Sequence, residues 1–84
     1  MVNKLIVFDR YDRAELFTKT IQKGVYNKTE SVITTDEGDK IYVGVITSLE
    51  EGRKYAGMTF VSVTFHGKIS EDATQFLRAR VRLV

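Results

Sequence analysis

The chain has 84 residues, of which 43% are hydrophobic, and its formal net charge is +2. It contains no cysteine, which excludes disulfides, thiol catalysis and thiolate metal sites and is typical of a reducing cytoplasm. No stretch approaches the roughly 20 apolar residues that cross a bilayer, so we expect one cytoplasmic domain over residues 1–84 that contacts no membrane.

Alternating apolar and polar residues predict most of the elements. The first strand is expected over Val2–Phe8. Glu15–Gln22 fits both a strand and a helix, and its threonines favour a strand. Lys23-Gly24 then predicts a hairpin turn, with the chain returning through Val25–Thr35.

The second half of the chain continues the pattern. The β-branched segment Lys40–Thr47 predicts a buried strand, Ser48–Gly52 an acidic loop, and Met58–Phe65 a further strand. Ser70 is a candidate cap for a short helix. About five short strands with regular turns predict an all-β chain that closes into a small barrel.

The last predicted strand, Phe76–Val84, alternates arginine with apolar residues. In a strand, Arg78, Arg80 and Arg82 would form a cationic row about 6–7 Å apart, which resembles the repeat of an extended phosphodiester backbone. The alternative interpretation is an ordinary strand with a solvated outer face.

The distribution of charge indicates a polyanionic partner. Residues 1–28 hold six basic and three acidic residues, residues 29–52 one basic and six acidic, and residues 53–84 six basic and two acidic. Both ends are therefore basic and the middle is acidic, so a compact fold could bring basic residues from both ends together.

Enzymatic interpretations find little support in the sequence. His66 is the one histidine, and no glycine pattern of a nucleophile elbow or a phosphate loop is present. The paired carboxylates fall in expected turns, where charge is normally solvated. We therefore expect a non-catalytic protein without metal, cofactor or small-molecule substrate.

The candidate binding residues combine an aromatic ring with cations. Tyr26 lies beside Lys19, Lys23 and Lys28 around the expected hairpin, and the arginine row would add phosphate contacts. Aromatic rings among cations are typical of surfaces that hold single-stranded nucleic acid. The alternative is that Tyr26 belongs to the core and the lysines only make the surface soluble.

Several segments, in order and near-colinear spacing, resemble the gene V single-stranded DNA-binding proteins of filamentous phages. The resemblance runs from about Gln22 to Val84. The matching segments are Gln22-Lys23-Gly24-Val25-Tyr26 with Glu30, Asp36-x-Gly38 with Val43 and Val45, Leu49-Glu50-Glu51-Gly52, Tyr55-Ala56-Gly57 with Phe60, Lys68-Ile69, and Arg80-Val81-Arg82-Leu83-Val84.

This resemblance implies an OB-like five-stranded barrel with a protruding hairpin, a homodimer, and cooperative coating of phage single-stranded DNA during replication in the host cytoplasm. By position it assigns stacking to Tyr26 and phosphate contacts to Arg80 and Arg82. The chain departs from the family at Leu16, Ile21 and Ile46, where the family carries basic residues. It also lacks the family's stacking aromatic in the loop of residues 70–75.

Two other functions remain open from the sequence. RNA could be bound in place of DNA. A different class is a small β-barrel protein-interaction module, for instance a phage factor that binds a host protein, which would present the acidic middle segment to a basic partner and have no nucleic-acid role.

Overall fold

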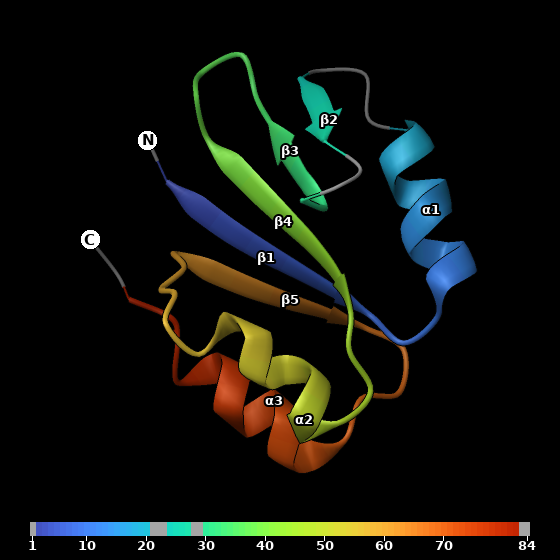
Figure 1. Ribbon diagram of the computed structural model, residues 1–84, viewed down its shortest axis with the longest axis vertical. Coiled ribbons are helices and arrows are strands. Elements are labelled where there is room, and N and C mark those ends of the chain that lie inside the picture. Colours follow the sequence, from blue (N-terminus) through green and yellow to red (C-terminus); the bar gives the residue numbers. More distant parts are fainter. Residues whose placement is uncertain (1, 21–23, 28–29, 83–84) are drawn as a thin grey trace.

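The structure is a computed structural model that describes residues 2–20, 24–27 and 30–82 (Figure 1). Over these ranges it contains a five-stranded mixed sheet with the strand order β2-β3-β4-β1-β5. The strands are β1 (Asn3–Phe8), β2 (Val25–Asn27), β3 (Val32–Thr34), β4 (Lys40–Val45) and β5 (Ser62–His66). The helices are α1 (Tyr11–Thr20), α2 (Leu49–Gly52), the 3-10 helix η1 (Arg53–Tyr55) and α3 (Glu71–Arg78).

The central strand β1 sets the topology. It pairs in parallel with β4 on one side and β5 on the other, while β2, β3 and β4 are joined by antiparallel pairing. Parallel neighbours need long crossover connections. The first crossover contains α1 and the β2–β3 hairpin, and the second contains α2 and η1.

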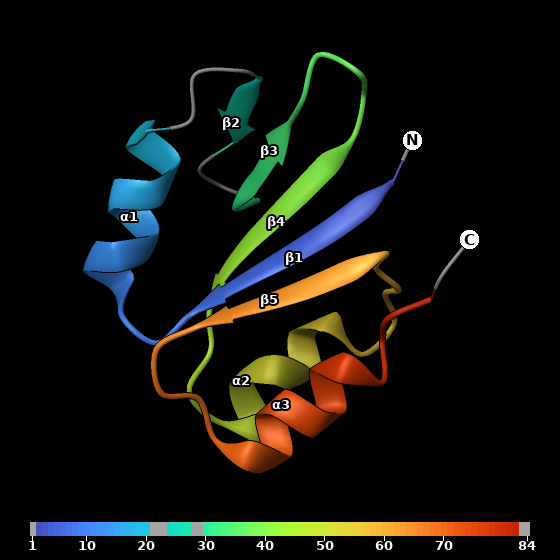
Figure 2. The ribbon, with the colours of Figure 1, turned by 180° about the vertical axis from the view of Figure 1, so that it is seen from behind.

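Helices cover both faces of the sheet (Figure 2). Successive side chains of a strand point to opposite faces. Leu5 and Val7 accordingly share one core cluster with Leu77 of α3, whereas Phe8 belongs to a second cluster with Ala14 of α1. The α1 side of the sheet carries the larger of the two cavities described for this chain.

The expected closed barrel is not what the chain forms. The sheet is open, with β2 and β5 at its two edges, and short helices pack on it, so the fold is a small α/β arrangement. The physical reason is the parallel pairing around β1, because its crossovers place helices on the faces of the sheet.

The strand predicted over Glu15–Gln22 is wrong for residues 15–20, because Tyr11–Thr20 is helical, and Ile21 and Gln22 lie outside the described residues. Ala14 and Phe17 pack onto the sheet at helical spacing, and the helix continues through two threonines whose hydroxyls donate to backbone carbonyls. Thr18 Oγ1 donates to the Glu15 carbonyl at 2.8 Å. Burial of one helix face therefore outweighed the β-propensity of threonine.

The predicted arginine strand is also corrected. Arg78 lies in the last turn of α3, and residues 79–80 form a turn before Val81 makes an isolated parallel bridge with Phe60. The deciding contacts are those of Ala73 and Leu77, both fully buried and one helical turn apart. The alternating arginines thus span a helix end and a short extended segment, and they form no strand row.

Three other predicted strands or caps are found in the structure, and one predicted strand is shorter than expected. The strands over Val2–Phe8 and Lys40–Thr47 correspond to β1 and β4, and Ser70 caps α3, accepting a hydrogen bond from the Ala73 amide. Met58–Phe65 shortens to β5. The acidic segment Ser48–Gly52 is a helical turn and not a loop.

The hairpin expected from the strand Glu15–Gln22 through Lys23-Gly24 into Val25–Thr35 is wrong, because the first of its arms is the helix α1 over the described residues. A different hairpin forms inside the second arm. Tyr26 of β2 pairs with Ile33 of β3, so the Val25–Thr35 segment is itself the hairpin. Gly24 lies before β2 with φ +103°, and a Cβ there would sit 2.4 Å from the Thr34 carbonyl oxygen, so glycine is required. Lys23 lies outside the described residues. None of the helices in the described ranges could span a membrane.

Candidate functional site

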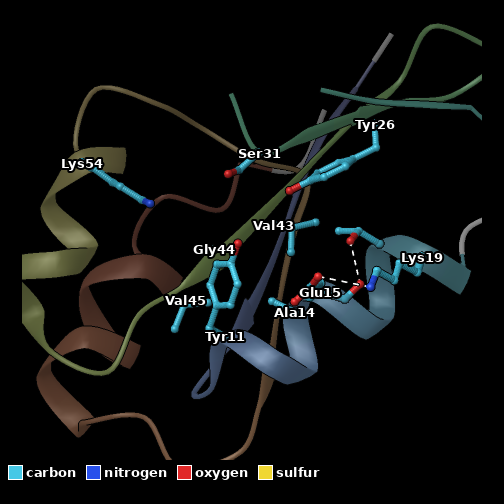
Figure 3. Close-up of a pocket in the computed structure, with 11 residues that line it drawn as sticks. Tyr11, Ala14, Glu15, Lys19, Tyr26, Ser31, Val43, Gly44, Val45 and Lys54 are labelled. Carbon is cyan, nitrogen blue, oxygen red and sulfur yellow. Dashed lines mark hydrogen bonds and ion pairs between the residues drawn. The ribbon is translucent and has the colours of Figure 1, made fainter. Parts of the chain in front are cut away.

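A cavity of about 460 Å³ opens between α1 and the sheet, and we call it the tyrosine groove (Figure 3). Its residues come from α1, β2, the turn after β2, β4 and η1. They are Tyr11, Ala14, Glu15, Thr18, Lys19, Tyr26, Ser31, Val43, Gly44, Val45 and Lys54. The groove therefore gathers side chains that are far apart in the sequence.

One face of α1 forms a whole wall of the groove. Its residues Tyr11, Ala14, Glu15, Thr18 and Lys19 follow the spacing of a single helix face. Ala14 is small and packs against the sheet, which leaves room in front of it, while Tyr11 at the first turn is 65% exposed. The helix thus presents an aromatic ring at one end of the wall and a lysine at the other.

Tyr26 forms the facing wall. It lies directly opposite Ile33 in the antiparallel pair of β2 and β3, and residues so paired share a face. Because Ile33 belongs to the core cluster beneath α1, Tyr26 also points to the α1 side, where it is 36% exposed. Figure 3 shows the rings of Tyr11 and Tyr26 both reaching into the cavity.

Two lysines flank the groove from opposite sides (Figure 3). Lys19 Nζ lies 3.2 Å from Glu15 Oε1, an exposed ion pair one helical turn apart. Lys54 Nζ lies 5.2 Å from the centroid of the Tyr55 ring and pairs with no carboxylate among the described residues. Two lysines and one glutamate line the groove, which makes it weakly cationic.

The arginines are placed elsewhere. Arg80 Nη1 donates to the Ala56 carbonyl at 2.8 Å, and its Cζ lies 5.4 Å from the centroid of the Phe76 ring. Arg78 Cζ lies 5.8 Å from the Phe65 ring centroid. Arg80 therefore ties the segment after η1 to the end of α3, and this contact occupies part of its guanidinium.

Arg82 lies at a second cavity of about 390 Å³, shared with Lys40 from β4 and floored by Tyr42 and Phe60. Its backbone amide donates to the Phe60 carbonyl at 2.7 Å. Tyr42 and Phe60 belong to the core cluster on the α3 side of the sheet, so this cavity and the tyrosine groove involve opposite faces.

Tyr26 and the arginines do not form one surface. Tyr26 is on the edge strand β2, whereas Val81 bridges to Phe60 near the other edge, beside β5. The two edges are four strand spacings of roughly 4.8 Å apart, or about 19 Å. We expected a compact fold to bring basic residues from both ends of the chain together, but in this open sheet Tyr26 and Arg82 line cavities on opposite faces.

Of the predicted site residues, the structure brings Tyr26 and Lys19 together, and Lys23 and Lys28 lie outside the described residues. Sequence reasoning missed Tyr11 and Lys54. The helical spacing from Tyr11 to Lys19 could have indicated the first, had that segment been predicted as a helix. No local signal pointed to Lys54, which reaches the groove through the packing of η1.

No family model, curated protein or solved structure matches this chain. The similarity to gene V proteins stays a prediction from the sequence.

Other polar groups have local structural roles. The His66 ring stacks on Phe8 with centroids 5.0 Å apart. The Asp9 carboxylate accepts the Lys68 amide at 3.0 Å, and that bond lowers the pKa of Asp9. Over residues 2–20, 24–27 and 30–82, no group of three or more His, Cys, Asp or Glu side chains could hold a metal ion.

The acidic middle of the chain is divided. Asp36 and Glu37 lie in the turn before β4, whereas Glu50 and Glu51 lie in α2 after it. The Glu51 carboxylate accepts the Thr47 hydroxyl at 2.8 Å, a bond that lowers its pKa. The six residues of β4 separate the two groups along the chain.

Proposed function

We propose that this chain is a non-catalytic protein that binds single-stranded nucleic acid in the tyrosine groove. The observation that carries the proposal is the convergence of two partly exposed tyrosines and two lysines on one cavity between α1 and the sheet. Unpaired bases stack on aromatic rings, and nearby lysines neutralise the backbone.

The size and lining of the groove support this choice. A volume of about 460 Å³ lies within the range of ligand sites, and its walls are mostly apolar with few charged groups. A duplex hides its base faces in the stack, so rings that reach into a small cavity suit an unpaired base better.

Single-stranded DNA is the preferred ligand on the strength of the similarity to the phage gene V proteins. That similarity also underlies the proposals of a replication role, a homodimer, cooperative coating and a cytoplasmic location. The open sheet gives no support to the barrel that the family resemblance implied, so the groove and not the fold carries the proposed function.

The test is a titration with short oligo(dT) and oligo(rU), followed by tyrosine fluorescence at low and at moderate salt. The proposal predicts saturable quenching that weakens as salt rises. Tighter binding of oligo(rU) than of oligo(dT) would mean that RNA is the ligand. The absence of quenching with either oligomer at low salt would refute the proposal.

A second candidate is a protein-interaction module, now centred on the same region. The large hydrophobic side chains most exposed in the described residues are Tyr11, Leu16, Val25 and Tyr26, all from α1 and β2. Leu16 and Val25 are aliphatic and offer no ring on which a base could stack. A protein partner that contacts the outer surfaces of α1 and β2 would depend on Leu16 and Val25, whereas nucleic-acid binding in the groove would tolerate their replacement by alanine.

A further inference from the structure

The tyrosine groove holds more than the one ring predicted from the sequence. Tyr11 and Tyr26 approach the cavity from different elements, the first from the start of α1 and the second from β2 (Figure 3). Ala14, Val43 and Gly44 line the same cavity, so the two rings border a space whose other walls include small and aliphatic groups. Two rings on one cavity can contact a single aromatic ligand together.

The two lysines differ in availability. Lys19 is engaged by Glu15 on its own helix, which reduces its net attraction for a phosphate. Lys54 contacts the groove from the opposite side and has only the Tyr55 ring as a partner in the described part of the chain. A phosphate entering beside the groove would therefore gain more from Lys54 than from Lys19.

We propose that Tyr11 and Tyr26 hold one unpaired base of the strand between them, and that Lys54 contacts a phosphate next to that base. This inference rests on the proposed function and assigns to it two residues, Tyr11 and Lys54, that the sequence did not indicate. The site accepts one base for each chain, with recognition by stacking and without a large set of base-edge contacts.

The experiment measures the affinity of the full chain for labelled oligo(dT) and for an abasic oligomer of the same length by fluorescence anisotropy. The variants are Tyr11→Ala, Tyr26→Ala and their double mutant. Tyr11→Phe keeps a ring, and Leu16→Ala is the control on the outer side of the same helix. Circular dichroism checks that each variant is folded.

Each alanine variant is expected to bind oligo(dT) roughly 5- to 150-fold more weakly, whereas binding of the abasic oligomer stays unchanged. Because both rings contact one base, the double mutant loses less than the product of the two single effects. Tyr11→Phe and Leu16→Ala bind like the wild type. Lys54→Ala weakens both oligomers equally, since it removes a phosphate contact.

Wild-type affinity for oligo(dT) in a folded Tyr11→Ala variant, with weaker binding by Tyr26→Ala, would overturn this inference and leave the proposed function standing. Multiplicative effects in the double mutant would overturn the shared base. If the wild type binds neither oligomer at low salt, the proposed function itself fails.

Discussion

At the scale of single residues, the role of Arg80 suggested by the structure differs most from the role expected from the sequence. The sequence offers it as a phosphate contact, but its guanidinium donates to the Ala56 carbonyl and stacks on Phe76. A hydrogen bond from a charged donor contributes about 1.5–3 kcal/mol, and an exposed ring contact less. Arg80 therefore has a role in stability.

We predict that Arg80→Ala lowers the free energy of unfolding by roughly 1–3 kcal/mol, as measured by urea denaturation. Arg78→Ala is the matched control, because it loses only the contact with Phe65 and should cost less than about 1 kcal/mol. Equal stabilities of the two variants would show that the Arg80 contact with Ala56 contributes nothing.

Tyr55 couples stability to alkaline pH. Burial of its hydroxyl, with a further effect from Tyr42, raises the pKa of Tyr55 to about 12. In the unfolded chain the group titrates near 10, so above that pH the unfolded state loses its proton first. Stability is fully present below pH 10 and falls by roughly 2–3 kcal/mol as pH rises to 12.

The check is urea denaturation of the wild type and of Tyr55→Phe at a series of alkaline pH values. The phenylalanine variant has nothing to titrate at this position, so its stability should fall less between pH 10 and 12. Parallel pH profiles for the two proteins would mean that Tyr55 ionises equally easily in both states.

At the scale of elements, the sequence was most informative where one signal dominated. The buried β-branched residues of β4 and the alternation in β1 predicted their strands, and Ser70 marked the beginning of α3. The wrong predictions fell in segments that fit both the helical period of 3.6 residues and the strand period of 2 residues. In α1 and α3, apolar residues one helical turn apart pack on the sheet. The threonines of the first segment and the alternating arginines of the second nevertheless led to a prediction of strands.

The candidate site was only partly predictable for the same reason. Tyr26 could be recognised from its lysine-rich surroundings, but Tyr11 requires the helix and Lys54 requires the packing of η1. The positions of the arginines could be known only from the sheet topology. An alternating pattern does not indicate which strand of the sheet the segment will pair with. Contacts between distant segments are set by tertiary packing, which local patterns do not contain.

Capping of α3 provides a test at this scale. The Ser70 hydroxyl accepts the Ala73 amide at 3.4 Å, and Asp72 Oδ1 accepts the same amide at 2.9 Å. The side-chain hydrogen bond with Ser70, and after it the bond to the Ala73 amide, lower the pKa of Asp72. Because Asp72 still accepts the Ala73 amide when Ser70 is absent, Ser70→Ala should cost about 0.5–1 kcal/mol, the lower part of the usual range for a cap, even though it also removes the hydrogen bond between Ser70 and Asp72.

Chemical denaturation measures this cost, with Ser62→Ala on the exposed face of β5 as the control. The control should change stability by less than about 0.5 kcal/mol. A Ser70→Ala variant as stable as the control would show that Asp72 alone satisfies the first turn of α3.

At the scale of the whole molecule, the open sheet separates two cationic regions. Lys19 and Lys54 flank the tyrosine groove, and Lys40 and Arg82 lie at the cavity on the other face. Nucleic acid bound in the groove would neutralise phosphates through the first pair. For two phosphates on a single strand, log K should fall by roughly 1.4 for each tenfold rise in salt.

We predict that Lys54→Ala reduces this salt dependence by about half, because it removes one phosphate contact, while Arg82→Ala leaves it unchanged. Affinities for oligo(dT) at four or more salt concentrations give the slope for each variant. The reverse result, with a flatter slope for Arg82→Ala alone, would move the interface to the cavity on the α3 side.

The most direct test is a nuclear magnetic resonance titration of the labelled protein with short oligo(dT), following every backbone amide. Binding in the tyrosine groove predicts that the perturbed amides cluster at Tyr11–Lys19, Tyr26 and Gly44–Val45, with little change around Lys40 and Arg82. Perturbations centred on Asn3, Lys40 and Phe60, or no perturbation at all at low salt, would contradict the account.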